Sequence, residues 1–416
     1  MPFPIRRKEL VWLVILAGIV TVWIRYIHHS SVVLGAAAAA TGAKGSQDQG
    51  SGNSSSGLEI GGQKIVQLVR KATRSSTDPE FLSATVLPGR GMNLFQITAK
   101  LPGEGVVNVL ASPSLNEAAT VLNDGPDDSH GVKSFSFGGA FLVPYPNRIR
   151  GKLTPDGRNI VTQWKGKTLT LPAVWKGKVN PNAELHAIHG LILDRKTDSI
   201  EINDLPDGQM VRGVIHARDF GGYWPSSTDL TITIILKAET LEASITAKNV
   251  GSEPEPLGIG WHPYFAIPSG DRKQARLHIP AADLAEVNNY DDVFPTGRLV
   301  PVAGTKYDFT SPRGVALGGL FLDDNFSRLT RTAGDVVVNL TDPAANYGLH
   351  IEGLSKEIRT IQVYAPPDKP FAAIEEQFNF ADPFNPIWGQ TDTGMVTLRP
   401  NQSVTWRVRL ALFTPH

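Results

Sequence analysis

The sequence contains no cysteine among its 416 residues. Disulfide bonds, thiolate nucleophiles and cysteine-ligated zinc sites are therefore excluded. Net charge is lacking too, because 40 lysine and arginine residues balance 40 aspartate and glutamate residues. Proteins that bind nucleic acid usually carry a basic surface, so this balance argues against a nucleic-acid partner.

Long segments with the apolar period of an α-helix are also missing, and so are internal repeats. What the chain has instead is a series of short segments in which apolar and polar residues alternate, as they do in β-strands. Residues 228–236 and 241–249 alternate in this way and predict a hairpin. Residues 395–398 and 403–413 predict a second hairpin near the C-terminus.

The last predicted strand shows the alternation most clearly. Its two faces differ in polarity: one carries Val404, Trp406, Val408 and Leu410, and the other carries Thr405, Arg407 and Arg409. A strand with one buried and one solvated face is typical of an antiparallel sheet. The sequence therefore predicts a single all-β domain, built as a large antiparallel β-sandwich.

The N-terminal part of the chain predicts export. Residues 1–9 include the basic cluster Arg6, Arg7 and Lys8, and residues 10–24 are uncharged and almost wholly apolar. A basic region followed by an apolar one is the order found in an export signal. This run is short for a membrane-spanning helix, but residues 10–27 reach a sufficient length if an arginine side chain extends to the membrane surface.

We expect residues 10–27 to be a retained signal anchor, with the basic residues 1–9 in the cytoplasm. Cleavage of a signal peptide near the alanine run at residues 36–40 is the alternative. Residues 28–57 predict a flexible linker rich in Ala, Gly and Ser, and residues 58–416 predict the folded domain. The domain is expected to be extracytoplasmic, periplasmic or on the cell surface, with membrane contact only through the N-terminal segment.

The stretch at residues 371–386, FAAIEEQFNFADPFNP, places two carboxylates, Glu375 and Glu376, in an apolar strand. Successive side chains on a strand point to opposite faces. We therefore expect one glutamate to face a pocket or the core and the other to face water. A carboxylate beside a loop rich in Pro and Asn suits a general base. An edge strand with two solvated glutamates is the alternative.

Four further stretches combine polar residues with Gly, Pro or aromatic neighbours. They are FGGAFLVPYPNRIRGK (137–152), LHAIHGL (185–191), GWHPYF (260–265), and NYDDVFPTGRLVPVAGTKYDF (289–309) followed by LFLDDNF (320–326). In order and spacing, these stretches and the late glutamate resemble the aldose 1-epimerase (galactose mutarotase) family. That family carries an NRI segment, an HG motif, H-x-YF, PTG…V-x-GT-x-x-DF and D-x-x-F. The resemblance covers residues 137–385, most of the predicted domain.

The resemblance implies a galactose-mutarotase-like supersandwich that interconverts the α and β anomers of a free aldose, a hexose, without a cofactor or metal. The family's catalytic base falls on Glu375, and the acid that protonates the ring oxygen falls on His262. The family's substrate-binding positions fall on His189, Asn147, Arg148 and Asp323.

These residue types suit the chemistry. Ring opening needs a base to take the proton of the anomeric hydroxyl and an acid to protonate the ring oxygen. Histidine, with an ordinary pKa of about 6.5, gives and recovers a proton near neutral pH. Arginine supplies donors in a planar fork, and aspartate accepts hydrogen bonds from hydroxyl groups.

The sequence also departs from the family pattern. The family's HGG reads HGL here, Glu376 adds a second carboxylate, and no counterpart is found for the family's glutamine between the aspartate and glutamate positions. Two choices stay open on the residues alone. Either His189 or His186, and either Asp323 or Asp324, contacts the substrate.

Two other functions remain as alternatives. A hexose-phosphate 1-epimerase would need a cationic cluster, for which Arg148, Arg150 and Lys152 are candidates. Sugar phosphates are uncommon outside the cytoplasm, so the export signal argues against it. A membrane-anchored carbohydrate-binding sandwich without catalysis would not need His262 together with Glu375.

Overall fold

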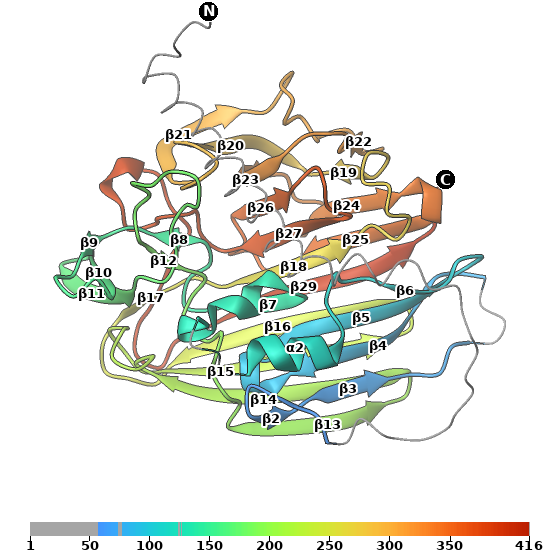
Figure 1. Ribbon diagram of the computed structural model, residues 1–416, viewed down its shortest axis with the longest axis horizontal. Coiled ribbons are helices and arrows are strands. Elements are labelled where there is room, and N and C mark those ends of the chain that lie inside the picture. The colour runs from blue at the N-terminus through green and yellow to red at the C-terminus, as the bar shows by residue number, and fades with distance from the viewer. Residues whose placement is uncertain (1–56, 74–76, 124, 126, 416) are drawn as a thin grey trace, which may run out of the picture. The chain divides into compact units, whose positions relative to one another are not determined.

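The computed structural model describes residues 57–73, 77–123, 125 and 127–415. Its largest element is a nine-stranded antiparallel sheet (Figure 1). The strands, in their order across the sheet, are β13 (Ser199–Leu205), β14 (Gly208–Arg218), β15 (Thr228–Lys237), β16 (Thr240–Asn249), β29 (Ser403–Phe413), β25 (Tyr347–Gly353), β24 (Val336–Asp342), β19 (Arg276–His278) and β22 (Val315–Ala316).

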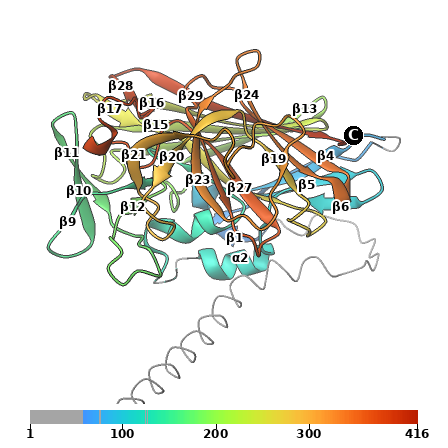
Figure 2. The same cartoon turned by 90° about the horizontal axis from the view of Figure 1, so that it is seen from above.

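A seven-stranded antiparallel sheet forms the second main layer. Its strands, in order, are β21 (Pro295–Pro301), β20 (Ala281–Val287), β23 (Leu322–Leu329), β26 (Thr360–Ala365), β27 (Phe371–Gln377), β18 (Gly260–Ala266) and β7 (Gly139–Leu142). Figure 2 shows β15, β16 and β29 in one layer and β20, β23 and β27 in the next. The predicted antiparallel β-sandwich is confirmed.

Smaller sheets extend this framework. One contains β3 (Val66–Val69), β4 (Glu80–Leu87), β5 (Asn93–Leu101) and β6 (Gly105–Asn108), and another contains β9 (Lys152–Leu153), β10 (Asn159–Trp164) and β11 (Lys167–Pro172). Three strand pairs are β1 (Glu59–Ile60) with β2 (Gln63–Lys64), β8 (Arg148–Ile149) with β12 (Ala187–Ile188), and β17 (Glu255–Leu257) with β28 (Val396–Leu398).

Among the residues that the structure describes, helices are few and short. They are α2 (Leu115–Leu122) and the 3-10 helices η2 (Pro88–Arg90), η3 (Ser129–Ser136), η4 (Pro343–Ala345) and η5 (Pro386–Trp388). At the start of α2 the side chains of Ser114 and Glu117 each accept a hydrogen bond from the other residue's backbone N–H, which is a capping box. This reciprocal cap satisfies two donors that a helix N-terminus otherwise leaves free.

The packing of the two layers is visible at Trp406 of β29. Its Nε1 donates a hydrogen bond of 2.9 Å to the backbone carbonyl of Glu376 in β27, so the indole crosses from one sheet to the other. Its ring also contacts Phe141 and Trp261 of the second sheet. Burial of such large apolar side chains between the sheets is the main stabilising contribution of a sandwich.

Of the two predicted hairpins, one is confirmed and one is wrong. β15 and β16 pair directly, with Leu236 opposite Leu241. β28 and β29 are both strands, but β28 pairs with β17 and β29 pairs with β16 and β25. The turn between them bonds to Asn249 at the end of β16 instead of closing a hairpin. The predicted two-faced character of β29 is confirmed, because its apolar residues are buried.

The predicted basic region, signal anchor and nearly all of the predicted linker lie outside the described residues. The first described strand, β1, begins at Glu59. Within the part of the chain that the structure describes, no helix has the length and apolar character needed to cross a membrane.

Candidate active site

The candidate site lies on one face of the seven-stranded sheet. Asn325 of β23 lies opposite Gln362 of β26, and Gln362 lies opposite Glu375 of β27. Directly opposite residues of antiparallel strands point to the same face and lie about 5 Å apart. The strand register therefore lines up three polar side chains across the sheet.

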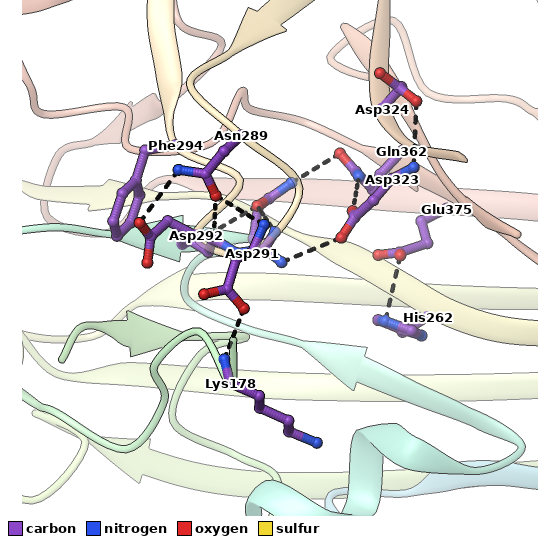
Figure 3. A network of polar contacts seen from close by, with 12 residues as sticks. Lys178, His262, Asn289, Asp291, Asp292, Phe294, Asp323, Asp324, Gln362 and Glu375 are labelled. Carbon is purple, nitrogen blue, oxygen red and sulfur yellow. Dashed lines mark hydrogen bonds and ion pairs between the residues drawn. The ribbon is translucent and has the colours of Figure 1, made fainter. Parts of the chain in front are cut away.

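His262 and Glu375 contact one another at this face. Nε2 of His262 lies 3.3 Å from Oε1 of Glu375, and the two side chains are only 6% and 1% exposed. Figure 3 shows the imidazole and the carboxylate pointing toward each other, with Asp323 and Gln362 alongside. The other carboxylate oxygen, Oε2, accepts a 2.8 Å hydrogen bond from Nε2 of Gln377. The carboxylate is thus held in one orientation, with Oε1 toward the histidine.

Burial shifts the proton affinities of this pair in opposite directions. It raises the pKa of Glu375 well above its ordinary value, and the hydrogen bond from Gln377 opposes this shift. It lowers the pKa of His262 to about 3. Both shifts arise because a buried site solvates a net charge poorly. These shifts favour the carboxylic acid of Glu375 and the neutral imidazole of His262. The arrangement with a carboxylate and an imidazolium holds the same number of protons and also carries no net charge.

His189 lies against His262. The two ring centroids are 5.0 Å apart and the rings are perpendicular, while Phe135 packs on His189 at 4.5 Å. The backbone N–H of His189 donates to the carbonyl of Asn147 at 2.9 Å, and its φ of 57° turns the chain into the site directly after β12. Burial, followed by the charges of His262 and Arg148, lowers the pKa of His189 well below its ordinary value, so this imidazole is neutral.

Four side chains next to this pair form a closed ring of polar contacts. Arg148 donates to Oδ1 of Asn147 at 3.1 Å and lies 3.4 Å from Oδ2 of Asp323. Gln362 closes the ring, because its Nε2 donates to Oδ1 of Asp323 at 2.8 Å and its Oε1 accepts from Nδ2 of Asn147 at 3.0 Å. Burial raises the pKa of Asp323, and the charge of Arg148 opposes that shift.

Gln362, Gln377 and Asn325 are members of the site that the sequence analysis missed. Gln362 lies between Asp323 and Glu375 in the sequence, the interval in which no counterpart of the family's glutamine was found. The available signal was a lone amide in the apolar strand TIQVYA. For Gln377 the signal was its spacing of two residues from Glu375, which places both on one face of a strand.

The structure separates the two aspartates whose roles the sequence left open. Asp323 faces Arg148 and Gln362, whereas Asp324 lies on the opposite face of β23. There its Oδ1 accepts a 2.9 Å hydrogen bond from the hydroxyl of Tyr290. Burial raises the pKa of Asp324 to about 6.

The two histidines of the LHAIHGL stretch are also distinguished by their contacts. His186 is buried, its Nδ1 lies 2.9 Å from the carbonyl oxygen of Glu184, and its ring packs on Phe294 at 4.8 Å. Burial lowers the pKa of His186 to about 4. His189 packs on His262 instead, so it is the histidine of this stretch that lies beside the acid–base pair.

The expectation that one of the two adjacent glutamates faces water is wrong. Glu376 points to the opposite face from Glu375, as the pleat requires, but it is fully buried. β27 lies inside its sheet between β26 and β18, and the nine-stranded sheet covers its other face. Neither carboxylate oxygen of Glu376 has a hydrogen-bond partner among the described residues, and burial raises its pKa to about 8.

The donors and acceptors of the site suit hydroxyl groups. Its two carboxylates, Asp323 and Glu375, accept hydrogen bonds, and Arg148 supplies fixed donors. Across the residues that the structure describes, no cluster of three or more histidine, aspartate or glutamate side chains is placed to hold a metal ion.

Solved structures with a similar fold define the class of protein. A galactose mutarotase-like protein from Clostridium acetobutylicum has a TM-score of 0.63 and 21% identity, with 84% of this chain and 98% of that chain covered. The GalM/aldose epimerase homologue from C. elegans has a TM-score of 0.61 and 20% identity, with 84% and 99% covered. At these identities the likeness shows the fold, a galactose mutarotase-like sandwich.

The family model for aldose 1-epimerase matches residues 109–411, so the chain belongs to the aldose 1-epimerase family. Membership supports a role as a carbohydrate epimerase or mutarotase. The curated relative YihR, an uncharacterised protein of Escherichia coli strain K12, is 25% identical over 185 residues. This match covers 41% of the chain and 53% of YihR, about half the length of that relative.

Proposed function

We propose that the protein interconverts the α and β anomers of a free aldose, a hexose, by acid–base catalysed opening and closure of the sugar ring. The observation that carries this proposal is the buried contact of 3.3 Å between His262 and Glu375. This contact supports the proposal because it brings two groups that can exchange protons together on one face of the sheet. The adjacent ring of Asn147, Arg148, Asp323 and Gln362 supplies the polar surroundings that a sugar requires.

In the proposed reaction Glu375, as a carboxylate, takes the proton of the anomeric hydroxyl O1. His262, as an imidazolium, gives its proton to the ring oxygen while the bond from C1 to that oxygen breaks and C1=O1 forms. Rotation about the C1–C2 bond exposes the other carbonyl face. Ring closure then reverses both proton transfers.

The pair holds one transferable proton throughout this cycle. It passes from carboxylate and imidazolium to carboxylic acid and neutral imidazole, and back again. Neither state carries net charge, which is the condition that the buried surroundings of His262 and Glu375 favour. The reaction therefore proceeds without creating an uncompensated charge inside the protein.

The remaining residues are proposed to bind the sugar. Arg148 and Asn147 donate to hydroxyl groups, and Asp323 accepts from them. His189, a neutral imidazole beside His262, lies where a sugar ring oxygen would approach. Asn147, Arg148 and Asp323 are already held by hydrogen bonds within the protein, and His189 is packed between Phe135 and His262, so little orientation has to be acquired on binding.

Polarimetry of the full-length protein tests the reaction. Freshly dissolved α-glucose and α-galactose relax to their anomeric equilibrium, and the wild type is expected to accelerate this relaxation. Glu375→Gln and His262→Ala are each expected to lose about a hundredfold or more of the acceleration, because each removes one proton-transfer group. His216→Ala is the control, since His216 is an exposed histidine paired with Asp229. A wild type inactive on these sugars and on a panel of other aldoses would refute the proposal.

The geometry favours a neutral sugar over a sugar phosphate. Of the three cations that could form a phosphate site, Arg148 is engaged by Asn147 and Asp323, and Arg150 donates to Asp382 at 2.8 Å. Lys152 is exposed on β9, in a separate sheet. A hexose 6-phosphate in the same assay is therefore expected to be the poorer substrate.

We also propose that the enzyme acts outside the cytoplasm, held by an N-terminal anchor. The support is the basic cluster at residues 6–8 followed by the apolar residues 10–24. Cell fractionation with N-terminal sequencing tests this. An intact N-terminus in the membrane fraction supports the anchor, a new N-terminus near residues 36–40 indicates cleavage, and an intact chain in the cytosol contradicts export.

A further inference from the structure

We propose that Tyr264 and Tyr364 are two further sugar-binding residues of this site, each binding one hydroxyl of the substrate through its phenol oxygen. This inference rests on the proposed function for the class of ligand, a neutral sugar. The strand register, the ring contacts and the unpaired phenol groups carry it.

The strand register places both tyrosines on the face of the site. Tyr364 lies opposite Asp323 on one side and Ala373 on the other, and Ala373 lies opposite Tyr264. The four residues therefore form one row across four strands. Ala373 precedes Glu375 by two positions, so this row runs directly beside the row that contains the base.

Tyr264 and Tyr364 flank a position that has almost no side chain. Ala373 lies between them in the row and leaves room for their rings. Both rings contact the ring of Phe371, with centroid distances of 5.0 Å for Tyr264 and 6.4 Å for Tyr364. Tyr264 also packs on His262 at 4.9 Å. These aromatic side chains form a small cluster separate from the main core between the sheets. They therefore contribute an apolar surface at the edge of the site.

The phenol groups are unpaired donors near two carboxylates. Among the described residues neither hydroxyl has a hydrogen-bond partner, although Tyr264 is only 8% exposed. Burial, the neighbouring Tyr364, and the charges of Glu375 and Asp323 raise the pKa of Tyr264 well above its ordinary value. Burial and the charge of Asp323 raise the pKa of Tyr364 to about 12. Both groups thus stay protonated and can donate at neutral pH.

A sugar hydroxyl is the partner that fits these groups. Neither phenol oxygen is among the fully buried polar atoms without a partner, so each remains accessible to a ligand. A ligand hydroxyl that approaches these oxygens can supply the hydrogen bond that the protein leaves open. A hydroxyl can accept from the phenol and donate to the adjacent carboxylate in the same position. Tyr264 packs on His262, and Tyr364 lies directly opposite Asp323, so the two phenols lie on the side of the acid–base pair and on the side of the proposed sugar-binding aspartate, respectively.

The test uses Tyr264→Phe and Tyr364→Phe, which keep the rings and remove only the hydroxyl groups. Mutarotation is measured on the preferred hexose and on its single-deoxy analogues. Tyr223→Phe is the control, because the ring of Tyr223 contacts His130 and none of the residues assigned to the site. Each variant is expected to raise KM about fivefold with kcat nearly unchanged, the size of one neutral hydrogen bond. The loss is expected to vanish on the one analogue that lacks the partner hydroxyl.

Calorimetric binding of a methyl glycoside, whose blocked anomeric centre cannot react, gives a readout independent of catalysis. Unchanged KM and unchanged glycoside affinity in both variants would overturn the inference, and so would an equal loss on every deoxy analogue. If the wild type binds the glycoside but accelerates no mutarotation, and the Phe variants bind about fivefold more weakly, the proposed reaction fails while these two roles stand. If the wild type neither binds the glycoside nor accelerates mutarotation, both proposals fail.

Discussion

Gln377 donates its side-chain N–H to Oε2 of Glu375 at 2.8 Å, two positions along the same strand. This contact turns Oε1 of the carboxylate toward His262. It also lowers the pKa of Glu375 against the larger raising effect of burial. One amide therefore orients the carboxylate of the proposed base and offsets part of the rise that burial causes in its pKa.

Replacing Gln377 by methionine keeps the length of the side chain and removes the donor. The pKa of Glu375 is then expected to rise, because its carboxylate loses the hydrogen bond that favours the charged form. The acidic limb of the profile of kcat/KM against pH should move to higher pH, with activity below that limb reduced about tenfold. Gln163→Met, at an exposed position of β10, is the control. An unshifted acidic limb would show that Gln377 does not tune the base.

Glu376 should make the protein less stable at alkaline pH. Its pKa in the folded protein is about 8 against an ordinary value of 4.5. The folded state therefore binds this proton more tightly than the unfolded state, and the contribution to stability is fully present below about pH 4.5. It is lost as the pH rises through about 8, by an amount on the order of a few kcal/mol.

Denaturant unfolding at pH 5, 7 and 9 measures this effect. Glu376→Gln keeps the shape of the side chain and cannot ionise, so its free energy of unfolding should fall less between pH 5 and pH 9 than that of the wild type. Glu239→Gln, at an exposed glutamate, should show the same fall in the free energy of unfolding between pH 5 and pH 9 as the wild type. An equal fall in the free energy of unfolding for the wild type and Glu376→Gln would contradict a buried, protonated Glu376.

The guanidinium of Arg148 lies 3.4 Å from Oδ2 of Asp323 and compensates the negative charge of that buried carboxylate. Arg148→Met leaves that carboxylate uncompensated, and its pKa, which burial already raises, should rise further. The variant should lose about 3 kcal/mol of stability at pH 8 and less at pH 5, where Asp323 takes up a proton.

The double variant Arg148→Met with Asp323→Asn removes both charges and should lose this extra pH dependence. Arg407→Met is the matched control, because Arg407 pairs with Glu242 at the surface, where a pair contributes about 0–1 kcal/mol. If Arg148→Met is equally stable at pH 5 and pH 8 relative to wild type, the carboxylate does not depend on Arg148.

The two adjacent aspartates should behave differently in kinetics. Asp323→Asn changes a group within the ring of site contacts, and we expect KM to rise about tenfold or more. Asp324→Asn changes a group that faces Tyr290 on the other side of the strand, and we expect KM to stay within about twofold. Steady-state polarimetry gives KM for both variants and so distinguishes the roles of the two aspartates. A larger effect at Asp324 would reverse the assignment.

Much of the fold follows from local patterns in the chain. Alternation of apolar and polar residues predicted β15, β16 and β29 because a strand exposes its two faces to different surroundings. The pairing of β28 could not be predicted in this way. Its partner, β17, is remote in sequence, and neighbouring strands in the chain pair only when their ends meet in space.

The candidate site, too, was predicted in part from the sequence and in part only from the tertiary structure. The sequence by itself determined which residue types occur in which order, and the resemblance of that order to the aldose 1-epimerase family pointed to six site residues, from Asn147 to Glu375. Only the tertiary structure decided which face each residue occupies, because the pleat and the strand register separate Asp323 from Asp324 and bury Glu376. It also brought in Gln362 and Gln377, since hydrogen bonds between strands depend on register, which the order of residues alone does not specify.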